Sequence, residues 1–109
     1  MNKLQSNESD EFDILRKINK KSNYSQRELA EELGFSLGKL NYGLKALKLK
    51  GLVKLKKFKA NPNKINYVHI LTPKGISKKT KLVIKFMDKK MREYDELKIE
   101  FENEKKKNK

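Results

Sequence analysis

The sequence predicts a mainly α-helical fold with one small β-hairpin, and three observations support this prediction. Two short helical segments, residues 26–33 and 36–50, are separated by a tight turn that contains glycine. Two segments with strand patterns follow them, and a polar connection joins them. The first alternates Val53 and Leu55 with lysines, and the second is rich in aromatic and β-branched residues. The chain then continues from residue 73 to 104 as one long helical pattern. Together these features predict a winged helix-turn-helix domain over residues 9–72, followed by a long C-terminal helix.

The composition favours a polyanionic partner. The 109 residues include 28 Lys or Arg and 14 Asp or Glu, which gives a formal net charge of +14 and a pI near 9.9. Nucleic acid is the first candidate partner for such a chain, and an anionic membrane surface is the second. Cysteine is absent, so disulfides, thiolate metal sites and cysteine catalysis are excluded. No segment resembles a signal peptide or a membrane span, so a soluble protein in the cytoplasm is expected.

The first two helices are short. After a flexible stretch over residues 1–8, apolar side chains recur at helical spacing over residues 9–20. The second helix should begin after Ser25, because Glu28 follows three positions later in a capping-box arrangement. Gly34 is expected to end this helix in the left-handed conformation. Ser36 is then expected to cap the next helix, because its side-chain oxygen can accept a hydrogen bond from a backbone N–H of the first turn.

The third helix, residues 36–50, is predicted to have two contrasting faces. Leucines spaced three or four residues apart form the buried face: Leu37, Leu40, Leu44 and Leu47. Small, polar and basic residues form the other: Gly38, Tyr42, Lys45, Ala46 and Leu49, with Lys39 beside them. A helix with such a face can enter the DNA major groove, roughly 12 Å wide. Gly38 is interpreted as a point of close approach to DNA, and Gly43 as a contact with one of the two preceding helices.

A β-hairpin over residues 52–71 is expected to form a wing beside the third helix. The segments LVKLKKF and INYVHIL become two antiparallel strands, and KANPNK connects them. Such a wing suits the DNA backbone or the minor groove. The wing residues assigned to DNA are Lys54, Lys56, Lys57, Lys59, Asn61, Asn63 and Lys64.

The last helix is expected over residues 73–104, opened by a Thr72 cap and by Pro73 in its first turn. It is too long for one small domain to bury, and it carries a heptad seam that predicts a coiled-coil homodimer. The seam residues are Ile76, Thr80, Val83, Met87, Lys90, Tyr94, Leu97 and Phe101. The alternative is that one face of this helix folds back over its own domain. A basic, disordered tail is expected over residues 105–109.

No catalytic or metal site is expected, and no cofactor is predicted. His69 is the single histidine, and it lies in a predicted strand without a nearby acid or second ligand. The sequence has no glycine-rich phosphate loop after a strand and no activated nucleophile. The acidic residues in the second half of the last helix argue against binding to a lipid surface. An enzyme is therefore not expected.

The function that these features predict is sequence-specific binding of double-stranded DNA. Gly38, Lys39, Asn41, Tyr42 and Lys45 are assigned to the bases, and Ser36 and Lys48 to the phosphates. Two alternatives remain: a non-specific architectural or RNA-binding module, and an interaction adaptor that acts through the coiled coil. The sequence lacks aromatic clusters for stacking single strands, which ranks RNA binding lower.

The chain resembles the winged-helix regulators of the MarR type. The segments YSQRELAEELGFSLGKLNYGLKALKLKGLVK, NPNK and LTPKGISKKT are similar to MarR-type regulators associated with bacterial exopolysaccharide gene clusters. The resemblance covers nearly the whole chain from Asp10 to Leu97, and SLGKLNYGLKAL and LTPKG are its most specific parts. It implies a cytoplasmic, homodimeric transcriptional regulator that acts near polysaccharide biosynthesis genes.

Two departures from larger MarR-type proteins limit what the resemblance implies. Those proteins build their dimer with additional terminal helices and often hold a phenolic ligand beneath it, so no small-molecule effector is expected here. They also commonly carry an Asp-Arg-Arg-like element near the wing tip, where this chain offers only Lys64 within NPNK. The resemblance therefore does not imply that an arginine of this chain reads the minor groove.

Overall fold

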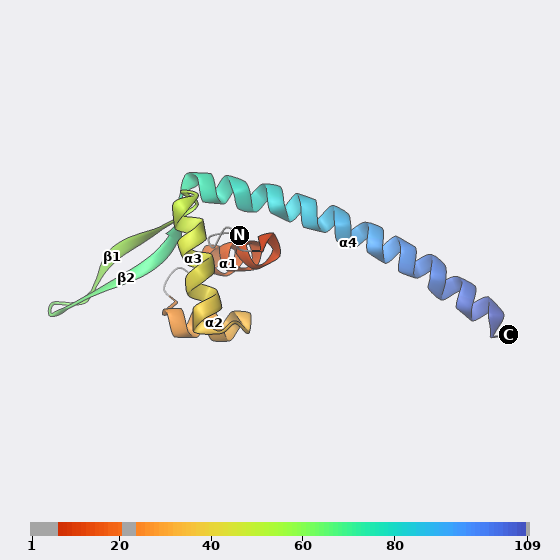
Figure 1. The fold of residues 1–109 in the computed structure, drawn as a ribbon, viewed down its shortest axis with the longest axis horizontal. Helices are drawn as coiled ribbons and strands as arrows, with labels where there is room; N and C mark the ends of the chain where they lie inside the picture. The colour runs from red at the N-terminus through yellow and green to blue at the C-terminus, as the bar shows by residue number, and fades with distance from the viewer. Residues whose placement is uncertain (1–6, 21–23, 109) are drawn as a thin grey trace. The chain divides into compact units, whose positions relative to one another are not determined.

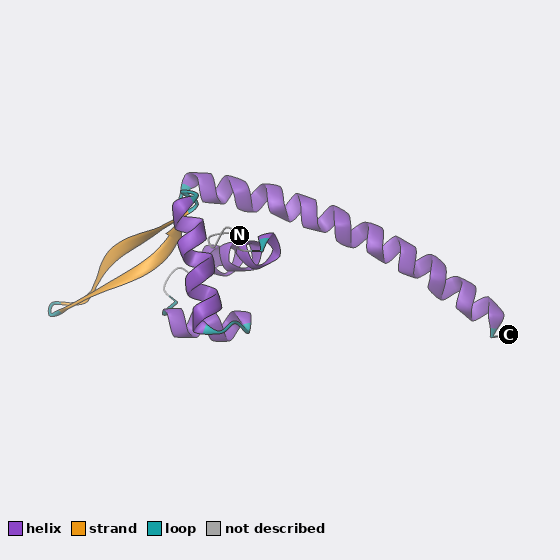
Figure 2. Cartoon of the chain, viewed as in Figure 1, coloured by secondary structure: helices purple, strands orange, loops and turns teal. Residues whose placement is uncertain are grey.

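The secondary structure follows the predicted order of three helices, a hairpin and a long helix. The computed structural model describes residues 7–20 and 24–108, and it describes no side chains for residues 58–61 and 64–66. The elements are α1 (Glu8–Lys20), α2 (Gln26–Leu33), α3 (Leu37–Leu49), β1 (Val53–Asn61), β2 (Lys64–Leu71) and α4 (Pro73–Lys107) (Figures 1 and 2). This order confirms the predicted fold class.

Helices α1, α2 and α3 pack together around an apolar centre, with α1 and α2 both in contact with α3 (Figure 1). The largest side chains that are fully buried come from all three helices: Ile14, Leu15, Leu29, Leu40, Leu44 and Leu47. Burial of a leucine or isoleucine side chain contributes roughly 1.5–3 kcal/mol, so this cluster is the main source of stability in the helical part.

Strands β1 and β2 form an antiparallel two-stranded sheet (Figure 2). The register pairs Val53 with Leu71 and Lys57 with Tyr67, and it shifts between Lys59 and Asn61. The strands extend further toward the tip than the two apolar segments suggested, and residues 62–63 form the turn. The hairpin base joins the apolar core, since Leu52 and Val53 are buried.

Three boundaries differ from the predicted ones. Helix α1 begins at Glu8, inside the stretch expected to be flexible, and residues 1–6 lie outside the described part of the chain. Helix α4 extends to Lys107, so the basic residues 105–107 are helical rather than disordered, and residue 109 is not described.

The third difference is the division of the chain into two units, the first ending at Lys79 and the second beginning at Thr80. We expected the boundary at Thr72, before α4. The first two turns of α4, residues 73–79, belong to the first unit, because Thr72, just before the helix, donates its backbone N–H to the Leu52 carbonyl at 3.0 Å. Gly75 also lies so close to the Leu52 backbone that a Cβ there would overlap it.

Candidate nucleic-acid interface

The turn between α2 and α3 fixes how the two helices of the helix-turn-helix meet. The Ser25 hydroxyl accepts a hydrogen bond from the Glu28 backbone N–H at 3.1 Å, and the Ser36 hydroxyl accepts one from Lys39 N–H at the same distance. Gly34 ends α2 with φ at 69°, the left-handed conformation that glycine adopts without strain. These contacts confirm the predicted caps and the glycine turn.

The buried face of α3 is narrower at its start than the leucine spacing suggested. Leu40, Leu44 and Leu47 are buried as predicted, whereas Leu37 is 46% exposed. Leu37 is the first residue of the helix. The prediction of a buried Leu37 is therefore wrong.

One flank of α3 faces α1. Its members recur at three- and four-residue spacing: Lys39, Gly43, Ala46 and Lys50. At Gly43 an added Cβ would lie 2.6 Å from the Ile14 Cδ1 atom, which confirms the predicted close helix packing and identifies α1 as the neighbour. Ala46 is fully buried, so its predicted place on the outward face is wrong. Small side chains at these two positions let α1 and α3 approach closely.

The two lysines of this flank form ion pairs with α1. Lys39 Nζ lies 3.4 Å from the Asp10 carboxylate and 4.3 Å from the centre of the Phe35 ring. Lys50 Nζ lies 2.6 Å from Glu11 Oε1, and the Glu11 side chain is only 7% exposed. Sequence reasoning did not identify either acid. The signal was present, because an acidic pair in the first turn of α1 accompanies two lysines on the glycine and alanine flank of α3.

The outward face of α3 presents small, polar and basic groups. Gly38, Asn41, Lys45 and Lys48 are exposed and Tyr42 is half-buried. A Cβ built at Gly38 would meet nothing within 4 Å, so this part of the helix backbone can be approached by another molecule. The structure brings these five residues to one side, whereas Lys39 lies on the flank toward α1.

The wing lysines lie on two faces of the hairpin. Successive side chains of a strand point to opposite faces, so Lys54 and Lys56 share one face and Lys57 lies on the other. All three are exposed. Asn63 is exposed in the turn. The side chains of the remaining predicted wing residues, Lys59, Asn61 and Lys64, lie outside the described ones. No single face of the hairpin therefore carries all of its lysines.

The base of the wing is fixed to the C-terminal end of α3. The Thr72 hydroxyl donates to the Gly51 carbonyl at 2.6 Å and accepts from the Gly75 N–H at 3.0 Å, which confirms its predicted cap role and links α3 to α4. His69 on β2 is buried, and its Nε2 atom has no hydrogen-bond partner among the residues that the structure describes. Burial and the nearby Lys48 charge lower the pKa of His69. Its predicted packing role is consistent with this environment.

The predicted dimer seam runs along α4. Its large apolar members are between 41% and 64% exposed: Ile76, Val83, Met87, Tyr94, Leu97 and Phe101. Exposed apolar side chains in heptad spacing are the pattern that a partner helix covers in a coiled coil. Among the described residues, no helix carries an apolar stretch of the length that crosses a membrane.

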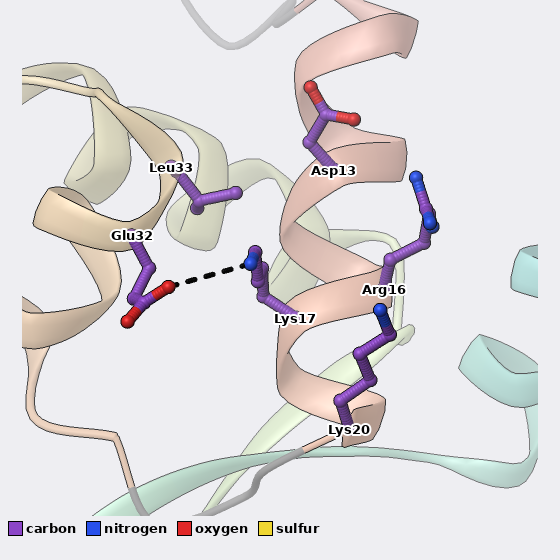
Figure 3. Close-up of a pocket in the computed structure, with 6 residues that line it drawn as sticks. All are labelled: Asp13, Arg16, Lys17, Lys20, Glu32 and Leu33. Carbon is purple, nitrogen blue, oxygen red and sulfur yellow. Dashed lines mark ion pairs between the residues drawn. The ribbon is translucent and has the colours of Figure 1, made fainter.

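A small cavity of about 260 Å³ lies between α1 and α2 (Figure 3). It is lined by Asp13, Arg16, Lys17, Lys20, Glu32 and Leu33. Lys17 and Glu32 point toward each other across it, with their charged atoms 3.6 Å apart. Sites for organic ligands are mostly apolar, whereas this one has Leu33 as its single apolar lining residue. We assign no ligand to it.

Residues 11–54 match the family model described as winged helix-turn-helix DNA-binding. The matched segment begins in α1 and ends at the start of β1, so it contains the helix-turn-helix and the first part of the wing. The chain therefore contains a winged helix-turn-helix domain. A comparison with curated proteins finds no match.

Several solved structures share the fold. A zinc-responsive MarR family member, ZitR of Lactococcus lactis, is 24% identical with a TM-score of 0.63, and the match covers 85% of this chain and 62% of that one. An apo form of a ZitR mutant is 21% identical with a TM-score of 0.65, with coverages of 83% and 65%. FabT of Streptococcus pneumoniae in complex with DNA is 24% identical with a TM-score of 0.54, covering 76% and 58%. The chain thus spans less than two thirds of the length of these proteins, and the likeness establishes a common fold.

Proposed function

We propose that the chain is a cytoplasmic, homodimeric transcriptional regulator of the MarR type that binds specific double-stranded DNA through α3 and the wing. The winged helix-turn-helix match, the fold shared with a regulator solved on DNA and the net charge of +14 support this proposal. The single observation that carries it is the outward face of α3. That face combines an open backbone at Gly38 with exposed Asn41, Lys45 and Lys48 beside Tyr42.

Each group on this face has a chemistry that suits DNA. An asparagine amide can donate to and accept from an adenine edge, and lysine can donate to guanine or to phosphate. Gly38 allows the helix backbone to approach the duplex, because no side chain holds it away. The Ser36 hydroxyl accepts from the Lys39 N–H, and its own proton remains able to donate to a phosphate oxygen. We therefore propose base contacts for Asn41, Tyr42 and Lys45, and phosphate contacts for Ser36 and Lys48.

Lys39 has a different role in this proposal. Its ammonium group is paired with Asp10 and lies over Phe35, on the flank toward α1. A base contact would require this pair to open. We propose that Lys39 adds to the positive field of the domain, and that Asp10→Ala would free it to contact phosphate and raise affinity for all sequences alike.

The wing lysines contribute to DNA affinity in a way that does not depend on the base sequence. Lys54, Lys56 and Lys57 are exposed on the two faces of the hairpin, which would allow contact with phosphates on both sides of a groove that the wing enters. The proposed target genes, those for exopolysaccharide biosynthesis, rest on the sequence resemblance alone.

The experiment that tests this function is selection of bound fragments from genomic DNA, followed by footprinting. We expect one enriched, roughly palindromic sequence with half-sites about 34–36 Å apart. If each dimer contacts about 6–10 phosphates, affinity should fall by roughly 10³–10⁵ between 50 and 200 mM salt. If no common sequence is enriched, specific recognition is refuted and a non-specific architectural protein is favoured. The net charge supports that function equally well.

A matched pair of variants separates base reading from charge. Lys45→Ala should weaken binding to the selected site more than binding to scrambled DNA, because Lys45 lies on the outward face of α3. Lys54→Ala removes the same charge from the wing and should weaken both alike. Equal losses at both DNAs for both variants would contradict the assignment of α3 to base reading. Retention of a protein partner with no DNA bound at low salt would favour an interaction adaptor.

A further inference from the structure

Helix α4 carries opposite charges in its two halves. Residues 74–92 include eight Lys or Arg and one Asp, a formal charge of +7, whereas the rest of the helix, residues 93–107, includes six Asp or Glu and four Lys, a formal charge of −2. All six acids lie within residues 93–104, and three of the four lysines are the last three residues of the helix. The whole segment is one α-helix, so the charges keep this order along the helix. A second copy that runs in the opposite direction would place each positive half beside a negative half. A parallel copy would place like charges side by side.

The polar residues of the seam favour the same orientation. In a parallel, in-register pair each seam residue meets its own copy, so the two Lys90 ammonium groups would face each other across the interface. An antiparallel register centred between Met87 and Lys90 instead pairs Lys90 with Met87 of the second copy. Thr80 then faces Leu97 of the second copy. Each polar residue thus meets an apolar one, against which the lysine stem can pack while its ammonium group reaches water.

The residues beside the seam fit this register. It places Lys79 opposite Glu100 of the second copy, and Ile84 opposite Met91 of the second copy. The Ile84 and Met91 side chains are 58% and 53% exposed in the single chain, so this pairing would cover both. Flanking ion pairs alone do not decide the orientation, because a parallel pair would bring Glu93 near Lys98. The seam lysine and the charge of the two halves decide it.

We infer that α4 binds the α4 helix of a second copy in antiparallel orientation, with the centre between Met87 and Lys90. The inference rests on the proposed homodimer and specifies its geometry. With a rise of about 1.5 Å per residue, the two Pro73 residues lie about 45 Å apart along the coiled coil. In a parallel pair they would lie at the same end.

Disulfide trapping tests the orientation, because the natural chain has no cysteine. Val83 and Tyr94 of the second copy face each other in the antiparallel register, whereas two Val83 residues lie about 16 Å apart, well beyond disulfide reach. Val83→Cys and Tyr94→Cys are prepared separately, mixed under reducing conditions to exchange subunits, and oxidised. We expect covalent dimers in the mixture and none in either protein alone.

Each outcome of this experiment bears on a different claim. Covalent dimers of Val83→Cys alone would show a parallel pair and overturn the inference, while the homodimer stands. A dimer in sedimentation that cross-links in none of the three samples overturns the register. A monomer in sedimentation at micromolar concentration contradicts the homodimer of the proposed function itself.

A charge exchange provides an independent readout. Lys79→Glu and Glu100→Lys should each weaken the dimer by roughly tenfold, because each substitution creates two repulsive contacts per dimer. The double variant Lys79→Glu with Glu100→Lys should recover most of that loss. These residues lie about 30 Å apart in a parallel pair, so additive losses in the double variant would overturn the antiparallel inference.

Discussion

Gly43 offers the sharpest test of how α3 is held on α1. In Gly43→Ala the new Cβ would lie 2.6 Å from the Ile14 Cδ1 atom, closer than carbon atoms pack. The contacted atom is the far end of the Ile14 side chain, which is fully buried, so this methyl group has to shift within the core. The substitution therefore overpacks the contact between the two helices.

The expected change in the free energy of unfolding is the difference between two effects. Overpacking a well-packed core costs about 1–3 kcal/mol. Replacing glycine by alanine inside a helix returns up to about 1 kcal/mol. We expect Gly43→Ala to lower the free energy of unfolding by about 1–2 kcal/mol. Gly38→Ala is the matched control on the same helix, and because its Cβ meets nothing within 4 Å it should be neutral or slightly stabilising.

Denaturant unfolding followed by circular dichroism measures these differences, with the protomer concentration held fixed because the proposed dimerisation would also stabilise the fold. The cause is tested by adding Ile14→Val, which removes the clashing Cδ1 atom and alone costs about 0.5–1.5 kcal/mol. The double variant should be about 1 kcal/mol more stable than the sum of the single losses predicts. Additive losses, or a Gly43→Ala variant at least as stable as the natural protein, would refute the proposed contact.

Three further substitutions test other parts of the fold. Gly75→Ala should destabilise by more than about 3 kcal/mol in thermal unfolding, because its Cβ would overlap the rigid Leu52 backbone; a loss smaller than that of Gly43→Ala would contradict this. Lys50→Met should cost about 1–3 kcal/mol in denaturant unfolding by leaving the Glu11 carboxylate buried without its partner, and Glu11→Gln added to it should restore part of the loss. The pKa of His69 is lowered by burial and by a nearby lysine, so the unfolded chain binds the proton more tightly. The stability that neutral His69 contributes is complete above pH 6.5 and is lost as the pH falls from there toward its folded pKa; His69→Gln should flatten this dependence, and an unchanged slope would exclude His69 as its source.

Local signals determined the order of the elements. Ser25, Gly34, Ser36 and Thr72 each act through hydrogen bonds or backbone angles within a few residues, and each lies where the spacing predicted. Such features can be predicted from sequence because the interacting groups are close in the chain.

The parts that could not be predicted depend on contacts between distant segments. A helical projection places Ala46 outward and leaves Lys39 accessible, because it does not include the position of α1. Once α1 packs on the Gly43 flank, Ala46 becomes buried and Lys39 is paired with Asp10. The extra turn of α4 at Lys107 is a smaller case, since a run of lysines does not by itself end a helix.

The division of the chain has the same origin. The first two turns of α4 stay with the winged unit through the contacts of Thr72 and Gly75 with residues 51–52, which lie at least 20 positions earlier. Periodicity within α4 carries no information on those contacts. The predicted boundary at the start of the helix therefore differs from the observed one between Lys79 and Thr80.

The most direct test of the central claim is the affinity ratio between the selected duplex and a scrambled duplex of the same length, measured at physiological salt for the natural protein and for Asn41→Ala. We expect a ratio of at least about 10³ for the natural protein. Asn41→Ala should lower the free energy of discrimination between the two duplexes by about 1–3 kcal/mol, while its affinity for scrambled DNA stays unchanged. A natural protein that binds both duplexes equally, or an Asn41→Ala variant that keeps the full ratio, would contradict the claim that the outward face of α3 reads DNA sequence.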